Sequence, residues 1–152
     1  MKNFVIIINF LLVLIPINYN YANYILANPT NYTSFLSGLV AGDTLFLSPG
    51  LYKNNLSLNN RNGTAQNPIV IIGSGNSTII QGQSCCNTVS ITKCSYLIIK
   101  DLQLDGLNEF VDALKAEGTS GNWAHHITIE NLIIVNYGVD QQAVGISTKC
   151  PA

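Results

Sequence analysis

Three segments in the C-terminal half of the chain repeat one pattern, and this repetition limits the fold more than any other feature. The segments read IVIIG, LIIKDLQLDGL and ITIENLIIVNY, and they align Ile71, Ile99 and Ile129, which lie 28 and 30 residues apart. A short apolar strand that returns at this interval is typical of a solenoid, because the period is too long for a coiled coil and too short for a domain. Each repeat then contacts only its neighbours, so function is expected on the outside of the solenoid.

The strands of this solenoid are predicted from short apolar runs bounded by turn residues. Thr44 to Leu47 is predicted as the first strand, ended by a turn at Pro49-Gly50, and the Asn-rich stretch 53–67 is interpreted as a polar loop that interrupts the winding. Asp101 and Asn131 are expected at tight bends, where their side chains bond the local backbone. The remaining strands are expected near 68–72, 77–81, 88–92, 96–100, 102–104, 112–117, 125–130, 132–135 and 143–148.

A short helix is expected before the first strand. Thr33 or Ser34 can cap it, and Gly42 can end it. Its apolar residues Phe35, Leu36, Leu39 and Val40 have helical spacing. We expect this helix to act as a lid over the first coil.

Alternation along the strands separates inward from outward side chains, because successive residues of a strand point to opposite faces. The predicted interior of one coil contains Val89, Ile91, Leu97, Ile99, Leu102 and Leu104, and that of the next contains Leu114, Ala116, Ile127, Ile129, Leu132 and Ile134. Burial of six such side chains does not offset the conformational entropy of a whole coil. Hydrogen bonds between coils are therefore required, and one coil alone cannot fold.

The two ends of the chain predict an exported protein that continues beyond the sequence. Residues 1–22 have the layout of a secretory signal peptide, with Lys2 before an apolar run that is broken by Asn9 and Pro16 and is too short for a membrane anchor. Residues 23–152 are predicted to form the N-terminal coils of one β-helix domain, because the chain stops directly after a strand without a cap. The net charge of −1 with 10% charged residues does not favour nucleic acid or an acidic membrane surface as a partner. The oligomeric state is left open.

Four cysteines in an exported chain raise the question of disulfides. Cys86 and Cys94 flank an extended run that holds them beyond the limit of about 7 Å between Cα atoms. Cys94 and Cys150 follow similar strings two coils apart, at a separation of about 10 Å if coils repeat every 4.8 Å. A vicinal Cys85–Cys86 bond, free thiols and partners outside this chain all stay open.

The opening of the chain resembles a known group of proteins. AGDTLFLSPGLY, NGTAQNPIVIIG and YLIIKDLQLDG are similar to the first coils of right-handed parallel β-helix proteins of the pectate-lyase-like superfamily. The Gly-Asp-Thr, Gly-x-Tyr and Asn-Pro-Ile elements are most similar to the alginate lyase and chondroitinase B group. The resemblance covers most of residues 35–150 and implies an all-β, right-handed parallel β-helix with a short N-terminal capping helix.

The resemblance also implies a function. It points to a secreted protein that binds or processes an extracellular polysaccharide, with β-elimination on a uronic-acid polymer as the leading reaction. A non-catalytic surface or adhesion module is the alternative, so enzyme activity is left open. In the similar lyases a basic residue removes the proton, and calcium or arginine neutralises the carboxylate, in later coils than these. No catalytic residue is therefore transferred, and no metal or cofactor is expected within this chain.

The similar enzymes bind their polymer along the outer face of the first sheet. Here that face is predicted to present Ser90, Thr92, Lys115, Glu117, Ser147 and Lys149. We take Thr92, Lys115, Glu117, Ser147 and Lys149 as candidate substrate-binding residues, with lysine pairing to uronate and glutamate accepting from a hydroxyl. The competing interpretation is an ordinary wetted surface with a weak ion pair.

Other chemically active residues are interpreted as structural. His125 and His126 are expected to face opposite ways and so not to share a metal ion. Trp123, Tyr96 and Tyr137 could form a stacking surface for sugar rings, although aromatic residues at such corners more often cover the core edge. Calcium needs several converging oxygen ligands, and the acidic residues are instead explained by their expected places at turns; they are Asp101, Asp105, Asp112 and Asp140.

Overall fold

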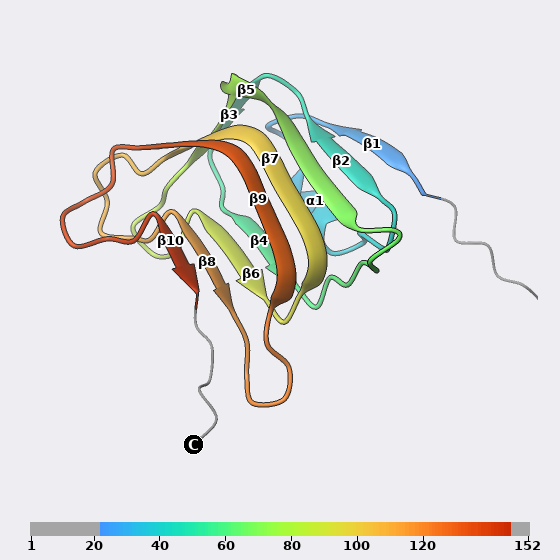
Figure 1. Ribbon diagram of the computed structural model, residues 1–152. Coiled ribbons are helices and arrows are strands. Elements are labelled where there is room, and N and C mark those ends of the chain that lie inside the picture. The colour runs from blue at the N-terminus through green and yellow to red at the C-terminus, as the bar shows by residue number, and fades with distance from the viewer. Residues whose placement is uncertain (1–21, 147–152) are drawn as a thin grey trace, which may run out of the picture.

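The computed structural model describes residues 22–146, which wind into a parallel β-helix (Figure 1). The predicted signal peptide, apart from Ala22, lies outside the described residues, as do Ser147, Lys149 and Cys150. Within the described part, no helix has the length and apolar character needed to cross a bilayer.

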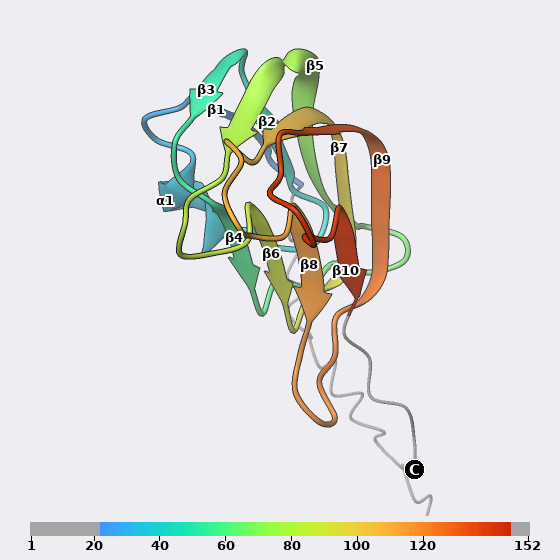
Figure 2. The same ribbon diagram turned by 90° about the vertical axis from the view of Figure 1, so that its left-hand side faces the viewer.

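The strands form two sheets, and all pairs between strands are parallel. Sheet A contains β1 (Tyr24–Ala27), β2 (Thr44–Leu47), β3 (Gly50–Tyr52), β5 (Ile69–Gln81), β7 (Ser95–Asp105) and β9 (His125–Val135). Sheet B contains β4 (Leu56–Asn59), β6 (Val89–Thr92), β8 (Leu114–Glu117) and β10 (Val144–Ile146). From β3 onward the chain passes from one sheet to the other and back in each turn, so strands far apart in sequence lie side by side (Figures 1 and 2).

The predicted column of isoleucines is confirmed by the register of sheet A. Ile71 pairs with Ile99, and Ile99 pairs with Ile129. Leu45 of β2 extends the column by one rung, since it pairs with Ile71. Leu45, Ile71 and Ile99 are fully buried, so the column lies in the interior of the coil.

The bends at Asp101 and Asn131 are confirmed, but their hydrogen bonding differs from the prediction. Both residues have left-handed backbone, with φ of 56° and 50°, a conformation that Asp and Asn adopt more readily than most residues. The Asn131 amide donates to the Asp101 carboxylate at 3.0 Å, so it bonds the preceding coil rather than the local backbone. Each bend lies within one continuous strand, β7 or β9, where two separate strands were expected.

The prediction of a polar loop over 53–67 is wrong, because this stretch contains β4. Leu56 and Leu58 are fully buried, while Ser57 and Asn59 point outward. β4 pairs with β6 in register from Leu56 to Asn59. The alternation Leu-Ser-Leu-Asn is only four residues long and stands among asparagines, so its local signal is weak. Pairing with β6 gives it a defined structure.

The N-terminal helix is shorter than predicted. α1 spans Thr33–Leu36, follows Tyr32 at the N-cap and has no side-chain cap. Neither Thr33 nor Ser34 therefore caps it, and Ser34 instead donates its hydroxyl to the Asn31 carbonyl. Tyr32 and Leu36 join the core, and α1 contacts β4, the edge strand of sheet B (Figure 2). The helix covers the first coil in the manner of the expected lid.

The predicted interior is tightly packed in the middle coils and looser in the last one. All six interior residues expected for the Val89 to Leu104 coil are at most 1% exposed. In β9, Ile127, Ile129, Leu132 and Ile134 are only partly buried and pack on the core from one side. The physical reason is that β9 pairs only with β7 among the described strands.

Tyr137 covers the core where β9 ends. Its ring lies against Gly106, where a Cβ atom would come within 2.6 Å of Tyr137 Cδ1, so the close approach depends on glycine. The Tyr137 hydroxyl donates to the Thr88 hydroxyl at 2.8 Å. Burial raises the pKa of Tyr137 from 10.0 to about 12.

This raised pKa predicts an alkaline loss of stability. Because the fold favours the neutral phenol, the contribution of Tyr137 is complete below pH 10.0 and is lost as the pH rises to about 12. The ionisation of Tyr137 is measured by tyrosinate absorbance during a pH titration of the wild-type protein and of Tyr137→Phe. The difference between the two curves should titrate near pH 12. A difference centred at the ordinary tyrosine pKa would contradict the prediction.

Candidate functional site

The outer face of sheet B presents two rows of polar side chains that cross the strands. Strand register places Ser57, Ser90 and Lys115 in one row and Asn59, Thr92 and Glu117 in the other. Neighbouring strands are about 4.8 Å apart, so the two rows together offer hydroxyl, amide and charged groups at short, regular intervals. We call these six residues the polar face. An extended polymer that crosses the strands would meet them in succession.

The two charged residues of the polar face are weakly paired. Lys115 Nζ lies 4.0 Å from Glu117 Oε2, and their side chains are 32% and 39% exposed. An ion pair at this distance and exposure contributes little, because water screens both charges. The lysine ammonium therefore remains available to an anionic ligand.

A pocket of about 280 Å³ borders the polar face on the side of α1. It is lined by Thr33, Leu36, Ser37, Asn55, Ser57 and Asn59. Ser57 and Asn59 belong to both the pocket and the polar face, so the two surfaces are continuous. Neither residue was predicted as a site residue, because residues 53–67 were expected to form a loop, but the Leu-Ser-Leu-Asn alternation is a signal for a strand here.

The structure brings three of the five candidate substrate-binding residues together. Thr92 pairs in register with Glu117, and Lys115 lies on the same strand as Glu117. On β10, the residue that pairs in register with Lys115 is Gly145, which has no side chain to extend the row. Ser147 and Lys149 lie outside the described residues. The polar face is therefore formed by β4, β6 and β8.

The expectation that His125 and His126 face opposite ways is wrong. His126 has left-handed backbone, with φ of 54°, and this breaks the alternation at the start of β9. The two Nδ1 atoms lie 2.7 Å apart. Tyr96 stacks on His126, with ring centroids 4.4 Å apart and an angle of 14° between the planes. Sequence alternation assumes regular strand backbone, which these residues do not have.

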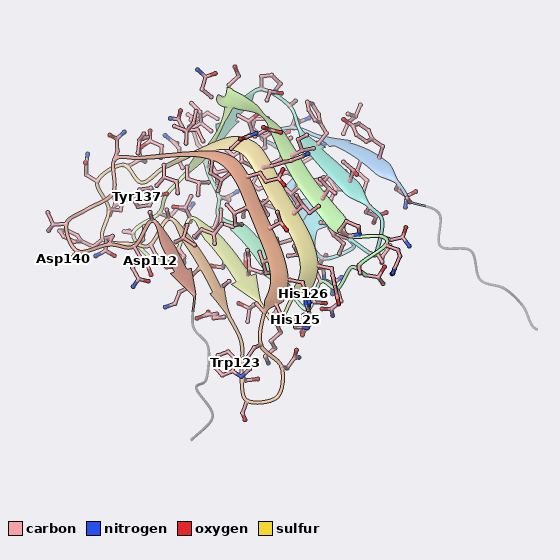
Figure 3. All side chains as sticks on the ribbon, viewed as in Figure 1. Asp112, Trp123, His125, His126, Tyr137 and Asp140 are labelled. Atoms are coloured by element: carbon pink, nitrogen blue, oxygen red, sulfur yellow. A yellow bond between two sulfur atoms is a disulfide. The ribbon has the colours of Figure 1, made fainter. Side chains whose placement is uncertain are left out.

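A shared aromatic surface does not form from the three predicted residues. Trp123 and the histidines lie at the start of β9, while Tyr137 lies at the opposite end of that strand (Figure 3). Tyr137 packs against the core beside Gly106. The interpretation of such aromatics as covers of the core edge is correct for Tyr137.

Asp105 and Asp112 accept hydrogen bonds mainly from the next coil. Asp105 Oδ1 accepts from the Leu107 backbone at 3.1 Å and from the Asn136 amide at 3.0 Å. Asp112 Oδ1 accepts from the Gln142 backbone at 3.0 Å. Within residues 22–146 no group of three or more His, Cys, Asp or Glu side chains is placed to hold a metal ion.

Among the alternatives for the cysteines, the structure has a vicinal Cys85–Cys86 disulfide. Cys94 is buried and forms no disulfide with another described residue. Burial raises the pKa of the Cys94 thiol, although backbone hydrogen bonds oppose this shift. The thiol is therefore shielded from solvent and kept in its less reactive form.

The architecture is that of the parallel β-helix proteins with a pectate-lyase-like fold, as the sequence resemblance implied. Among solved structures, the chain is similar to the PL6 family alginate lyase AlyGC, with 19% identity and a TM-score of 0.60 over 74% of this chain and 15% of that one. It is equally similar to a mannuronic acid specific polysaccharide family 6 lyase from human gut microbiota, with 18% identity, a TM-score of 0.60 and coverage of 74% and 26%.

This similarity shows the fold. The chain spans between 15% and 26% of the length of those two lyases. No protein-family model matches the sequence, and no curated protein matches it.

Proposed function

We propose that this chain belongs to a secreted β-helix protein that binds an acidic extracellular polysaccharide along the polar face of sheet B. The observation that carries the proposal is the register of that face, where Lys115 ends a row of serine hydroxyls and lies beside a second row that includes an amide and a hydroxyl. A uronate unit needs a cation for its carboxylate and hydrogen-bonding partners for its hydroxyls. The polar face provides both, and the alginate lyases with a similar fold act on a polymer of this kind.

The whole protein is further proposed to cleave its polymer by β-elimination. This reaction leaves an unsaturated product that absorbs ultraviolet light. The full-length protein should therefore be incubated with alginate, pectate and chondroitin while that absorbance is followed. A rise with one polymer supports a lyase. Binding to a glycan array without a rise for any polymer would instead favour a non-catalytic adhesion module.

Lys115 provides the direct test of the binding surface. Lys115→Ala is expected to weaken binding to the preferred acidic polymer by about tenfold, because one charge-assisted contact is lost. Binding should also weaken as salt is added, since an exposed charge is screened. Affinity electrophoresis in gels that contain the polymer measures both effects.

Lys100→Ala is the matched control. Lys100 is also partly exposed, but it lies on β7 in sheet A. Its replacement by alanine removes the same positive charge as Lys115→Ala. It should leave binding nearly unchanged. Equal losses for both variants would mean that only net charge matters and that the polar face is not the binding surface.

A further inference from the structure

A second chemically active cluster lies at the start of β9, away from the polar face. His125 and His126 are both exposed, and their Nδ1 atoms are 2.7 Å apart. Figure 3 shows the two side chains together beside the loop that carries Trp123. Neither histidine contributes to the polar face of sheet B. The pair therefore needs an explanation of its own.

The backbone and a neighbouring ring hold this pair in place. His126 and Tyr96 both have left-handed backbone, with φ of 54° and 51°, at equivalent places in successive coils. Tyr96 stacks on the His126 ring and meets the His125 ring edge-on, with centroids 5.8 Å apart and an angle of 84°. The same Tyr96 ring thus limits the motion of both imidazoles. The two nitrogens are preorganised rather than freely rotating.

The distance between the two Nδ1 atoms indicates which coordination geometry of a metal ion they would fit. With metal–nitrogen bonds of about 2.0–2.1 Å, donors 2.7 Å apart subtend an angle of about 80° at a shared ion. A tetrahedral ion would need its donors about 3.3 Å apart, whereas two adjacent positions of a square or octahedral ion need about 2.9 Å. The pair is closer to the second case. Copper(II) and nickel(II) prefer that geometry with nitrogen ligands, and copper(II) binds most tightly in the divalent series.

The surroundings leave room for the remaining ligands of such an ion. A pocket of about 360 Å³ adjoins His126 and is also lined by Tyr96, Thr64 and Thr128. Within residues 22–146, no carboxylate is hydrogen-bonded to either imidazole, and no third His, Cys, Asp or Glu joins the pair. Water would therefore complete the coordination, so the site would be open on one side.

We propose that His125 and His126 together bind one copper(II) ion on the outside of the coil. The alternative use of the 2.7 Å contact is a hydrogen bond in which one neutral imidazole donates to the other. The two uses differ in a measurable way, because only the first gives stoichiometric binding of added copper. The proposal is independent of polysaccharide binding.

The test uses the full-length protein without a polyhistidine tag, titrated with copper(II) near neutral pH. Trp123 is the single tryptophan of this sequence and lies two residues before His125, so bound copper should quench its fluorescence. We expect one copper per chain, with nitrogen coupling in the electron paramagnetic resonance spectrum. His125→Asn and His126→Asn should each lower the affinity by at least about tenfold, since each removes one of two protein ligands.

The variants are chosen so that a loss of folding does not mimic a loss of binding. Asparagine adopts left-handed backbone readily, so His126→Asn keeps the bend. Circular dichroism should match the wild type. Unchanged affinity in both histidine variants, or a spectrum without nitrogen coupling, would overturn the proposal and leave the hydrogen-bonded pair as the explanation.

Discussion

Replacing Ile99 by alanine is expected to lower the free energy of unfolding of the full-length protein by about 4 kcal/mol. Ile99 is fully buried and pairs with Ile71 on one side and Ile129 on the other. Truncation therefore leaves a cavity between two rungs that cannot close without moving a third strand. The loss is large beside the total stability of about 5–15 kcal/mol that most domains have. Urea denaturation of wild type and variant measures it.

Two further substitutions show whether stacking is the cause. Ile98→Ala removes the same atoms from the neighbouring outward position, which is partly exposed, and should cost less than about 1 kcal/mol. Ile129→Ala should fall between the two, because Ile129 is only partly buried. If Ile98→Ala cost as much as Ile99→Ala, the assignment of inward and outward faces in β7 would be wrong.

Replacing Gly63 by alanine is expected to destabilise the protein by about 3 kcal/mol. Gly63 lies where the chain leaves sheet B for sheet A, and a Cβ atom there would lie 2.5 Å from the Tyr96 carbonyl oxygen. It would also lie 2.8 Å from the Ile69 nitrogen. Both contacts are to backbone atoms, so no side chain can turn away. The Gly63 amide donates to the Ser95 carbonyl at 2.8 Å, and the shift would weaken this bond between coils.

Gly38→Ala is the matched control for this effect. Gly38 is exposed, and the nearest atom to its added Cβ, the Phe35 carbonyl oxygen, lies at 3.6 Å, an ordinary contact. The control should change stability by less than about 1 kcal/mol. Thermal unfolding of the two variants separates the outcomes. Similar midpoints for Gly63→Ala and the wild type would show that the close approach of the backbone at this corner is not required.

The parts of the fold that were predicted correctly depend on patterns within short stretches of sequence. The column of Ile71, Ile99 and Ile129 follows from a repeat, and the burial of Leu102 and Leu104 follows from alternation within one strand. The same alternation predicted that Thr92, Lys115 and Glu117 face outward, as their partial exposure shows. These features could be predicted without knowing the contacts between neighbouring coils.

The features that were missed depend on contacts with a neighbouring coil or on irregular backbone. β4 is recognised only through its pairing with β6, since Leu56 to Asn59 has a weak signal alone. The pocket beside α1 was missed for the same reason, because it needs Ser57 and Asn59 on a strand. The approach of His125 to His126 requires a left-handed residue inside a strand. Alternation predicts the opposite arrangement there.

By itself the sequence determined that the chain is a solenoid of short parallel strands, because period and alternation record which side chains must leave water. Only the tertiary structure decided which outward residues are neighbours, since register joins Ser57, Ser90 and Lys115 from three separate strands. It also decided that two adjacent histidines converge. The physical reason is that hydrophobic burial constrains each strand locally, whereas hydrogen bonds between coils and local backbone twists set the relative positions of the groups on the surface.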